Sequence, residues 1–220
     1  MSSRQPQFPP QRLQFPPLYA ILDPRQTHNR EPERVLCELL RGGVTLLQLR
    51  AKEMVPRDFL ALAKKTRELT ANHGCRLIVN DRADIALAAN ADGVHLGQED
   101  LPLHAARKLM GKKIVGISTH DLKQARAAVL GGADYIGFGP VFATTTKSTG
   151  YPARGTAMLR AIRADVSLPI VAIGGITEYN ATDVWESGAD SVAVISDILT
   201  ADDITDKVKR ILRRRPTAGS

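Results

Sequence analysis

Short apolar segments alternate with longer amphipathic ones along almost the whole chain. From Leu18 onward, eight short runs rich in Val, Ile and Leu each end in polar residues. Continuous hydrophobicity in so short a run is typical of a strand that is buried on both faces of a parallel sheet. The predicted strands are Leu18–Asp23, Thr45–Arg50, Arg76–Asp81, Gly93–Gly97, Lys113–Ser118, Tyr135–Val141, Pro169–Gly175 and Ser191–Ser196.

Longer segments with helical periodicity separate these runs. Apolar residues recur in them every three or four positions, as in a helix that packs one face against a sheet. Glycine follows several of them, as at Gly43, Gly132 and Gly188, where it supplies the left-handed conformation that ends a helix before the next strand. The predicted helices are Pro32–Arg41, Arg57–His73, Ala83–Asn90, Pro102–Met110, Leu122–Leu130, Thr156–Ala164, Asn180–Ser187 and Asp202–Arg214.

Strict alternation of strands and helices allows two α/β architectures, an open doubly wound sheet and a closed barrel. Eight repeats in roughly 200 residues fit a small (β/α)8 barrel. An open sheet would carry a glycine-rich dinucleotide fingerprint after its first strand, and Asp23-Pro24-Arg25 has no glycine. We therefore expect one α/β domain, a TIM barrel over residues 18–215. A Pro-rich, disordered or extended tail (1–17) precedes it and a short C-terminal tail (216–220) follows it.

The composition fits one ordinary globular domain. The 220 residues are 43% hydrophobic and 24% charged, which excludes wholesale disorder. No apolar stretch approaches the roughly 20 residues that a membrane helix needs, so we expect no membrane span. The two cysteines, Cys37 and Cys75, cannot build a disulfide framework, and the first residues lack the apolar segment of a secretory signal. These features predict a cytoplasmic protein.

The net charge of +7 lies mostly at the two ends of the chain. Residues 1–17 and 201–220 hold eight Lys/Arg and three Asp/Glu, which is +5, so +2 remains for residues 18–200. A nearly neutral domain is not expected to bind nucleic acid. The basic residues near the C-terminus follow three aspartates, the order that suits a solvated helix end. They are Lys207, Lys209, Arg210, Arg213, Arg214 and Arg215.

Polar residues gather where the predicted strands end, which in a barrel is the active-site rim. The rim carries cations at Arg50, Lys52 and Lys147 and carboxylates at Asp81 and Asp100. This mixture suits a polyphosphate held with Mg²⁺, because Mg²⁺ takes one or two carboxylates plus phosphate oxygens and basic residues neutralise the remaining oxygens. Either aspartate alone could instead cap the helix that follows it.

A second anion site is expected on the last two strands. Gly174-Gly175 and Ile195-Ser196 occupy the place where barrels commonly hold a phosphate through backbone N–H groups, although the two glycines could also form only a tight turn. Two anion sites indicate two phosphorylated substrates, or one substrate phosphorylated at both ends. Among the histidines, His95 is expected to be a hydrogen-bonding residue of the core or rim, while His120 could cap a helix or contact substrate.

Ordered motifs along the barrel identify a family. The chain resembles thiamine-phosphate synthase (thiamine-phosphate pyrophosphorylase) from about Leu18 to Leu199. The matching segments are Gln48-Leu49-Arg50-Ala51-Lys52, Val79-Asn80-Asp81, Gly93-Val94-His95-Leu96-Gly97-Gln98-Glu99-Asp100, Gly116-Ile117-Ser118, Gly137-Phe138-Gly139-Pro140-Val141, Thr144-Thr145-Thr146-Lys147 and Ile173-Gly174-Gly175-Ile176.

The resemblance implies a transferase of thiamine biosynthesis. It would couple 4-amino-5-hydroxymethyl-2-methylpyrimidine diphosphate with 4-methyl-5-(2-phosphoethyl)thiazole, giving thiamine monophosphate and pyrophosphate with one Mg²⁺ per subunit. Asp81 and Asp100 would hold the metal. The pyrimidine diphosphate would be bound by Gln48, Leu49, Arg50, Ala51, Lys52, Asn80, Ser118 and Lys147, of which Arg50, Lys52, Ser118 and Lys147 would be catalytic. The thiazole phosphate would be bound by Thr144, Thr145, Thr146, Gly175, Ile195 and Ser196.

Three other functions compete with this assignment. A thiazole tautomerase would have a similar fold but would lack some of the residues that bind the diphosphate and the metal. All of these residues are present here. A barrel isomerase or an aldolase would act on one sugar phosphate, and an aldolase would need a Schiff-base lysine inside a strand, where only Lys113 lies at an edge. A non-catalytic protein would bind polyanions through the basic C-terminus.

Overall fold

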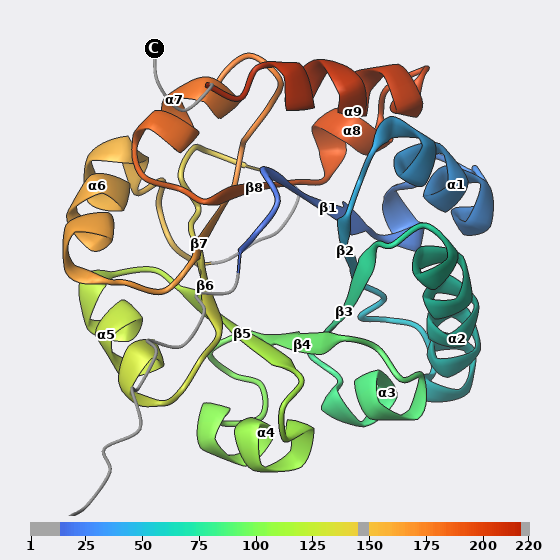
Figure 1. The fold of residues 1–220 in the computed structure, drawn as a ribbon, viewed down its shortest axis with the longest axis horizontal. Coiled ribbons are helices and arrows are strands. Elements are labelled where there is room, and N and C mark those ends of the chain that lie inside the picture. Colours follow the sequence, from blue (N-terminus) through green and yellow to red (C-terminus); the bar gives the residue numbers. More distant parts are fainter. Residues whose placement is uncertain (1–13, 145–149, 217–220) are drawn as a thin grey trace, which may run out of the picture.

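Eight parallel strands close into a barrel in the computed structural model, which describes residues 14–144 and 150–216 (Figure 1). Each strand pairs with the next along the chain, and β1 also pairs with β8. The predicted (β/α)8 barrel is confirmed. The strands are β1 (Leu18–Leu22), β2 (Leu46–Leu49), β3 (Arg76–Asn80), β4 (Gly93–Leu96), β5 (Ile114–Thr119), β6 (Tyr135–Phe138), β7 (Ile170–Ile173) and β8 (Ser191–Val194).

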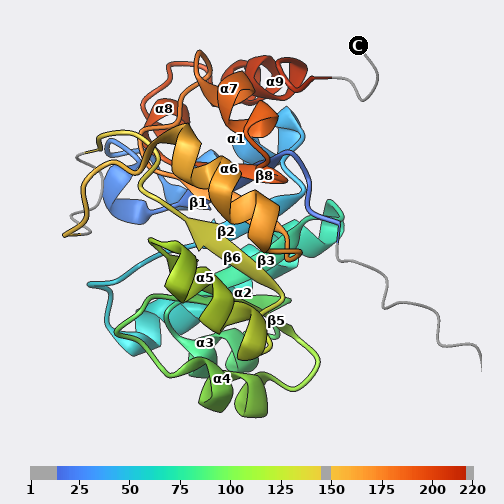
Figure 2. The same cartoon turned by 90° about the vertical axis from the view of Figure 1, so that its left-hand side faces the viewer.

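Helices cover the outside of the barrel, and Figure 2 shows α5 and α6 lying beside β6. Each predicted helix is present within a few residues of its expected ends. Two short elements were not predicted, the 3-10 helix η1 (Pro24–Gln26) and α8 (Ser196–Leu199). The other helices are α1 (Pro32–Gly42), α2 (Pro56–Asn72), α3 (Ala83–Ala88), α4 (Leu103–Met110), α5 (Leu122–Leu130), α6 (Gly155–Asp165), α7 (Ala181–Glu186) and α9 (Ile204–Arg213).

Alternate residues of each strand face two separate cores, as parallel strands buried on both faces require. One large core fills the layer between strands and helices, and includes Leu18, Ala20 and Leu22 of β1. A smaller core fills the barrel interior, where Tyr19 and Ile21 of the same strand lie. This alternation explains why the runs are hydrophobic without interruption.

Three aspartates clamp the starts of strands to the helices before them. Asp92 accepts a hydrogen bond from Leu77 N at 2.7 Å and pairs with Arg67 at 2.9 Å. The pairs Asp134–Arg107 and Asp190–Arg163 repeat the arrangement and accept from Val115 N and Ile170 N. The repeated Asp at the helix-to-strand joints is thus one structural unit used three times, at the end of the barrel opposite the strand ends.

The segment just before β1 belongs to the barrel. Phe15 is 8% exposed and packs in the interior core against the Tyr135 ring, with ring centroids 4.7 Å apart. Pro17 O accepts hydrogen bonds from Val192 N and Trp185 Nε1. Residues 14–17 therefore close the bottom of the barrel, whereas residues 1–13 and 217–220 lie outside the described part of the chain.

Helix α9 corrects one expectation about charge. Lys207 is buried and pairs with Glu178 at 3.2 Å and Asp197 at 3.1 Å, so it is not part of a solvated helix end.

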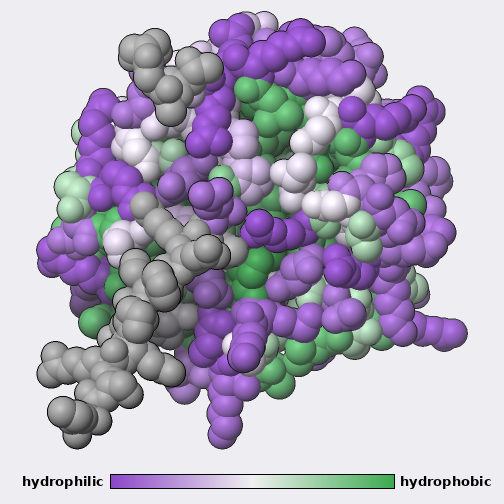
Figure 3. All heavy atoms as spheres, viewed as in Figure 1, coloured by the Kyte–Doolittle hydropathy of each residue, from purple (hydrophilic) through white to green (hydrophobic). Residues whose placement is uncertain are grey.

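Hydrophilic residues dominate the rim of the face seen in Figure 3, with hydrophobic residues visible nearer its centre. Within residues 14–144 and 150–216, no helix combines the length and the apolar character needed to cross a membrane.

Candidate active site at the carboxyl ends of the strands

A pocket opens inside the barrel and continues to the carboxyl ends of the strands. Tyr19, Ile21, Val171 and Ala193 contribute apolar walls, and polar groups come from β2, β3, β4, β5 and the loops that follow β6, β7 and β8. The predicted site residues that line it are Gln48, Arg50, Asn80, Ser118, Thr144, Gly175, Ile195 and Ser196.

The remaining predicted residues fall into three groups. The side chains of Leu49 and Ala51 pack in the core between strands and helices, so these side chains do not line the pocket. Lys52, Asp81 and Asp100 form a cluster beside it. Thr145, Thr146 and Lys147 lie outside the described residues.

Two carboxylates meet at the ends of neighbouring strands β3 and β4. The Asp81 and Asp100 side chains are in hydrogen-bonding contact, and Lys52 Nζ lies 2.9 Å from Asp81 Oδ2. Burial and the neighbouring Asp100 raise the pKa of Asp81, while Lys52 opposes that rise. Close carboxylates of this kind repel one another unless a proton or a cation lies between them.

Neither aspartate caps the helix that follows it. The residues at the N-terminal caps of α3 and α4 are Arg82 and Pro102, and neither helix has a side-chain cap. Asp81 has a φ of 62°, a left-handed conformation that is uncommon for a residue other than glycine. Asp100 instead accepts a hydrogen bond from Gly97 N at 2.6 Å. The capping alternative is therefore wrong for both positions.

The donor set of this cluster fits Mg²⁺. Within the described part of the chain, no group of three or more His, Cys, Asp or Glu residues could form an all-protein metal cage. A pair of carboxylates beside a polar pocket suits Mg²⁺, which usually keeps waters and takes substrate phosphate oxygens as further ligands.

A buried carboxylate that was assigned no role holds Arg50 in place. The Arg50 guanidinium pairs with Asp23, whose side chain is only 2% exposed. Asp23 also accepts a hydrogen bond from Arg25 N and so begins η1. The sequence places Asp23 at the end of the first apolar run and Arg50 at the end of the second. These two runs form the neighbouring strands β1 and β2, so this position could have indicated the contact.

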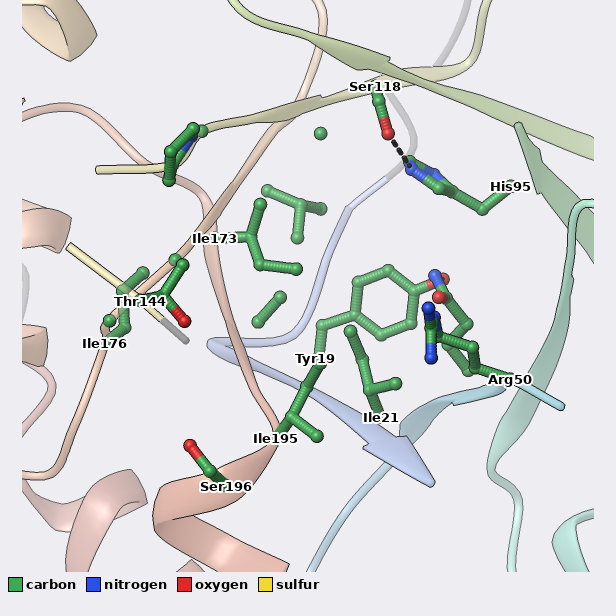
Figure 4. Close-up of a pocket in the computed structure, with 18 of the residues that line it drawn as sticks. Tyr19, Ile21, Arg50, His95, Ser118, Thr144, Ile173, Ile176, Ile195 and Ser196 are labelled. Atoms are coloured by element: carbon green, nitrogen blue, oxygen red, sulfur yellow. Dashed lines mark hydrogen bonds between the residues drawn. The ribbon is translucent and has the colours of Figure 1, made fainter. Parts of the chain in front are cut away.

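The opposite side of the pocket is built from main chain and hydroxyl groups. Gly174 and Gly175 end β7 with φ values of 102° and 62°, so the strand stops two residues earlier than expected. A Cβ at Gly175 would lie 2.5 Å from Ala143 O, so only glycine fits there. Figure 4 shows Thr144 and Ile176 on one side of the pocket and Arg50 on the other, with Ser196 near Ile195.

Two histidines line the pocket and both are hydrogen-bonded. His95 Nε2 lies 3.0 Å from Ser118 Oγ, which confirms its expected role as a hydrogen-bonding residue. His120 Nδ1 bonds Gly139 O at 2.5 Å, and its ring stacks on Tyr151 with centroids 3.9 Å apart. Helix α5 is capped by Asp121 rather than by His120. His120 therefore faces the pocket instead of capping the helix.

Comparisons with known proteins agree with this architecture. Residues 18–198 match the family model described as thiamine monophosphate synthase. A thiamine-phosphate synthase of Chloroflexus aurantiacus is 47% identical over 194 residues, which cover 88% of this chain and 90% of that protein. One of Clostridium acetobutylicum is 46% identical over 193 residues, covering 87% and 91%.

A solved structure, a thiamine phosphate pyrophosphorylase from Pyrococcus furiosus, superposes with a TM-score of 0.83 at 38% identity and covers 90% of this chain and 94% of that one. The match to the family model over residues 18–198 includes all eight strands of the barrel and the strand ends that build the pocket. The chain therefore belongs to the thiamine monophosphate synthase family of transferases.

Proposed function

We propose that the enzyme joins 4-amino-5-hydroxymethyl-2-methylpyrimidine diphosphate to 4-methyl-5-(2-phosphoethyl)thiazole and releases pyrophosphate. The observation that carries this proposal is a pocket with two unlike polar sides. One side has Arg50 and the adjacent cluster of Lys52, Asp81 and Asp100, and the other has the Gly174-Gly175 turn, Thr144 and Ser196. Two phosphorylated substrates can therefore approach one another across an apolar floor.

The charged side suits the diphosphate. Arg50 and Lys52 supply positive charge near the carboxylate pair, and Asn80 and Gln48 offer amide groups in the same part of the pocket. Asp81 and Asp100 would hold Mg²⁺, which when bound neutralises charge on the diphosphate oxygens. Lys147, which lies outside the described residues, is proposed to complete this charge set.

The other side suits a phosphate monoester. The Gly174-Gly175 turn packs closely against Pro140 and Ala143 and lines the pocket, as do the hydroxyl-bearing residues Thr144 and Ser196. Backbone N–H and hydroxyl donors bind a phosphate without a full countercharge. Asn180 Nδ2 donates to Gly175 O at 3.0 Å and holds the turn in shape.

The chemistry proposed here needs little proton transfer. Loss of pyrophosphate leaves positive charge on the pyrimidine methylene carbon, which the aminopyrimidine ring delocalises, and the thiazole nitrogen then attacks that carbon. Arg50 and Lys52 stabilise the negative charge that develops on the leaving group, and Ser118 donates a hydrogen bond to it. The barrel walls hold both rings in line for attack.

Pyrophosphate release by the purified protein tests the proposal. We expect release only when both precursors and Mg²⁺ are present together, and none when either precursor is omitted or the metal is chelated. A folded protein that stays silent in every combination would contradict the proposal. The thiazole tautomerase and a sugar-phosphate isomerase would then be the next activities to assay.

Removing either carboxylate tests the metal assignment. Asp81→Asn and Asp100→Asn should each lower turnover at least a hundredfold, because one neutral amide cannot replace a charged Mg²⁺ ligand. The Mg²⁺ concentration needed for half-maximal rate should rise in both variants. Circular dichroism should stay as in the wild type, and near-wild-type turnover would remove that aspartate from the metal site.

A further inference from the structure

A chain of five hydrogen-bonded side chains crosses the barrel interior and ends at the pocket. Gln48 Nε2 donates to Tyr19 OH at 3.0 Å, and the Tyr19 and Tyr135 hydroxyls are 3.0 Å apart. His95 Nδ1 lies 2.9 Å from Tyr135 OH, and His95 Nε2 lies 3.0 Å from Ser118 Oγ, the contact drawn in Figure 4. We call these five residues the polar chain.

Two glycines leave the space that the polar chain occupies. A Cβ at Gly116 would lie 2.1 Å from the Tyr135 ring, and a Cβ at Gly137 would lie 2.9 Å from His95 Cε1. Strands β5 and β6 thus lack side chains at the two places where the rings of the polar chain pass. An interior packed only with apolar residues would carry side chains at these two positions. The two glycines therefore leave room for the Tyr135 and His95 rings.

One assignment of protons lets all hydrogen bonds of the polar chain run in the same direction. If Tyr19 OH, which accepts from Gln48 Nε2, gives its own proton to Tyr135 OH, then Tyr135 OH gives its proton to His95 Nδ1, and each hydroxyl has an acceptor within the polar chain. His95 then carries its proton on Nε2 and donates it to Ser118 Oγ. The Ser118 hydroxyl proton is left to point into the pocket.

Burial keeps both phenols available as donors. Tyr19 and Tyr135 are almost fully buried, and burial raises the pKa of each well above its ordinary value. Both hydroxyls therefore stay protonated at neutral pH. Without the Tyr135 donor, nothing in the polar chain would favour the His95 tautomer that donates to Ser118, and Ser118 could turn its proton back toward His95 Nε2.

We propose that Tyr135 is a positioning residue, which acts through His95 to keep the Ser118 hydroxyl proton directed at the departing diphosphate. Tyr135 is fully buried and lies behind the pocket wall, while the other four members of the polar chain line the pocket. The assignment rests on the proposed function, since it gives Ser118 a leaving group to donate to.

The kinetic test combines Tyr135→Phe with Ser118→Ala. Tyr135→Phe keeps the ring and removes only the hydroxyl, and should lower kcat about fivefold with little change in the KM of either substrate, as expected for one hydrogen bond. In the Ser118→Ala background the same change should have no further effect, because its target is gone. An equal fivefold loss in both backgrounds would overturn the proposal.

Nitrogen-15 NMR of the His95 imidazole gives a test that needs no turnover. The signal, assigned by its loss in His95→Gln, should show the proton on Nε2 in the wild type and a mixture of both tautomers in Tyr135→Phe. A wild-type proton on Nδ1, or an unchanged spectrum in Tyr135→Phe, would overturn the proposal. These results stand even if the wild type releases no pyrophosphate, a result that would contradict only the proposed function.

Thr119→Val is the matched control. Thr119 is also fully buried, lies next to Ser118 on β5, and donates its hydroxyl to Gly137 O at 3.3 Å. It is outside the polar chain, so its loss should leave both kcat and the His95 tautomer as in the wild type. A fivefold loss of kcat in Thr119→Val would show that removing any buried hydroxyl nearby has this effect, and would overturn the proposal.

Discussion

Arg50 is held at the pocket by a residue that does not itself line the pocket. The nearly buried Asp23 pairs with its guanidinium, and an ion pair of this kind loses more when one partner is removed than an exposed pair does. Asp23→Asn keeps the shape of the side chain but removes its charge, so the contact that holds Arg50 at the pocket is weakened. We expect kcat/KM for the pyrimidine diphosphate to fall about tenfold in pyrophosphate-release assays, which corresponds to about 1.4 kcal/mol.

Glu53→Gln is the control for this substitution. Glu53 forms an ion pair with Arg25, but both side chains are about two-thirds exposed, at 69% and 65%. Solvent screens such pairs, and they contribute little to stability or position. Glu53→Gln should therefore leave kcat/KM within twofold of the wild type. Equal kinetics for the two variants would mean that Asp23 does not position Arg50.

At the scale of elements, the three aspartate clamps lie at the end of the barrel away from the pocket. We therefore expect them to contribute to the free energy of unfolding and not to turnover. Asp134 ties the start of β5 to Arg107 of α4, at the end of the barrel away from the pocket. Asp134→Ala removes a backbone hydrogen bond and a partly exposed ion pair, and should lower the free energy of unfolding by about 1–2 kcal/mol. Denaturant unfolding measures this loss, while turnover at low temperature should stay unchanged.

An exposed aspartate provides the comparison for the clamp. Asp202 lies on the surface just before α9, and Asp202→Ala should leave the denaturation midpoint as in the wild type. If Asp134→Ala were as stable as Asp202→Ala, the clamp would contribute nothing. If it lost activity in proportion to stability, the two ends of the barrel would not be independent.

At the scale of the whole molecule, the sequence reveals the barrel more fully than the interior of its site. Eight uninterrupted apolar runs predict strands buried on both faces, and the polar residues that follow them predict the rim. The Asp23–Arg50 pair and the Tyr135–His95 contact join residues 27 and 40 positions apart. The hydrophobic periodicity of a short segment does not predict such contacts, because they depend on which strands become neighbours once the barrel has closed.

The Pro-rich start of the chain shows the same limit and supplies a final prediction. Phe15 stands next to the Pro-rich start of the sequence, outside the predicted strands and helices, yet it fills the bottom of the barrel against Tyr135. Phe15→Ala should lower the free energy of unfolding by about 3–5 kcal/mol, the usual loss for a buried phenylalanine, whereas Phe15→Leu should retain most of it. Denaturant unfolding of the two variants measures the difference. An unchanged midpoint in Phe15→Ala would place the start of the folded domain at Leu18, as the hydrophobic pattern alone suggested.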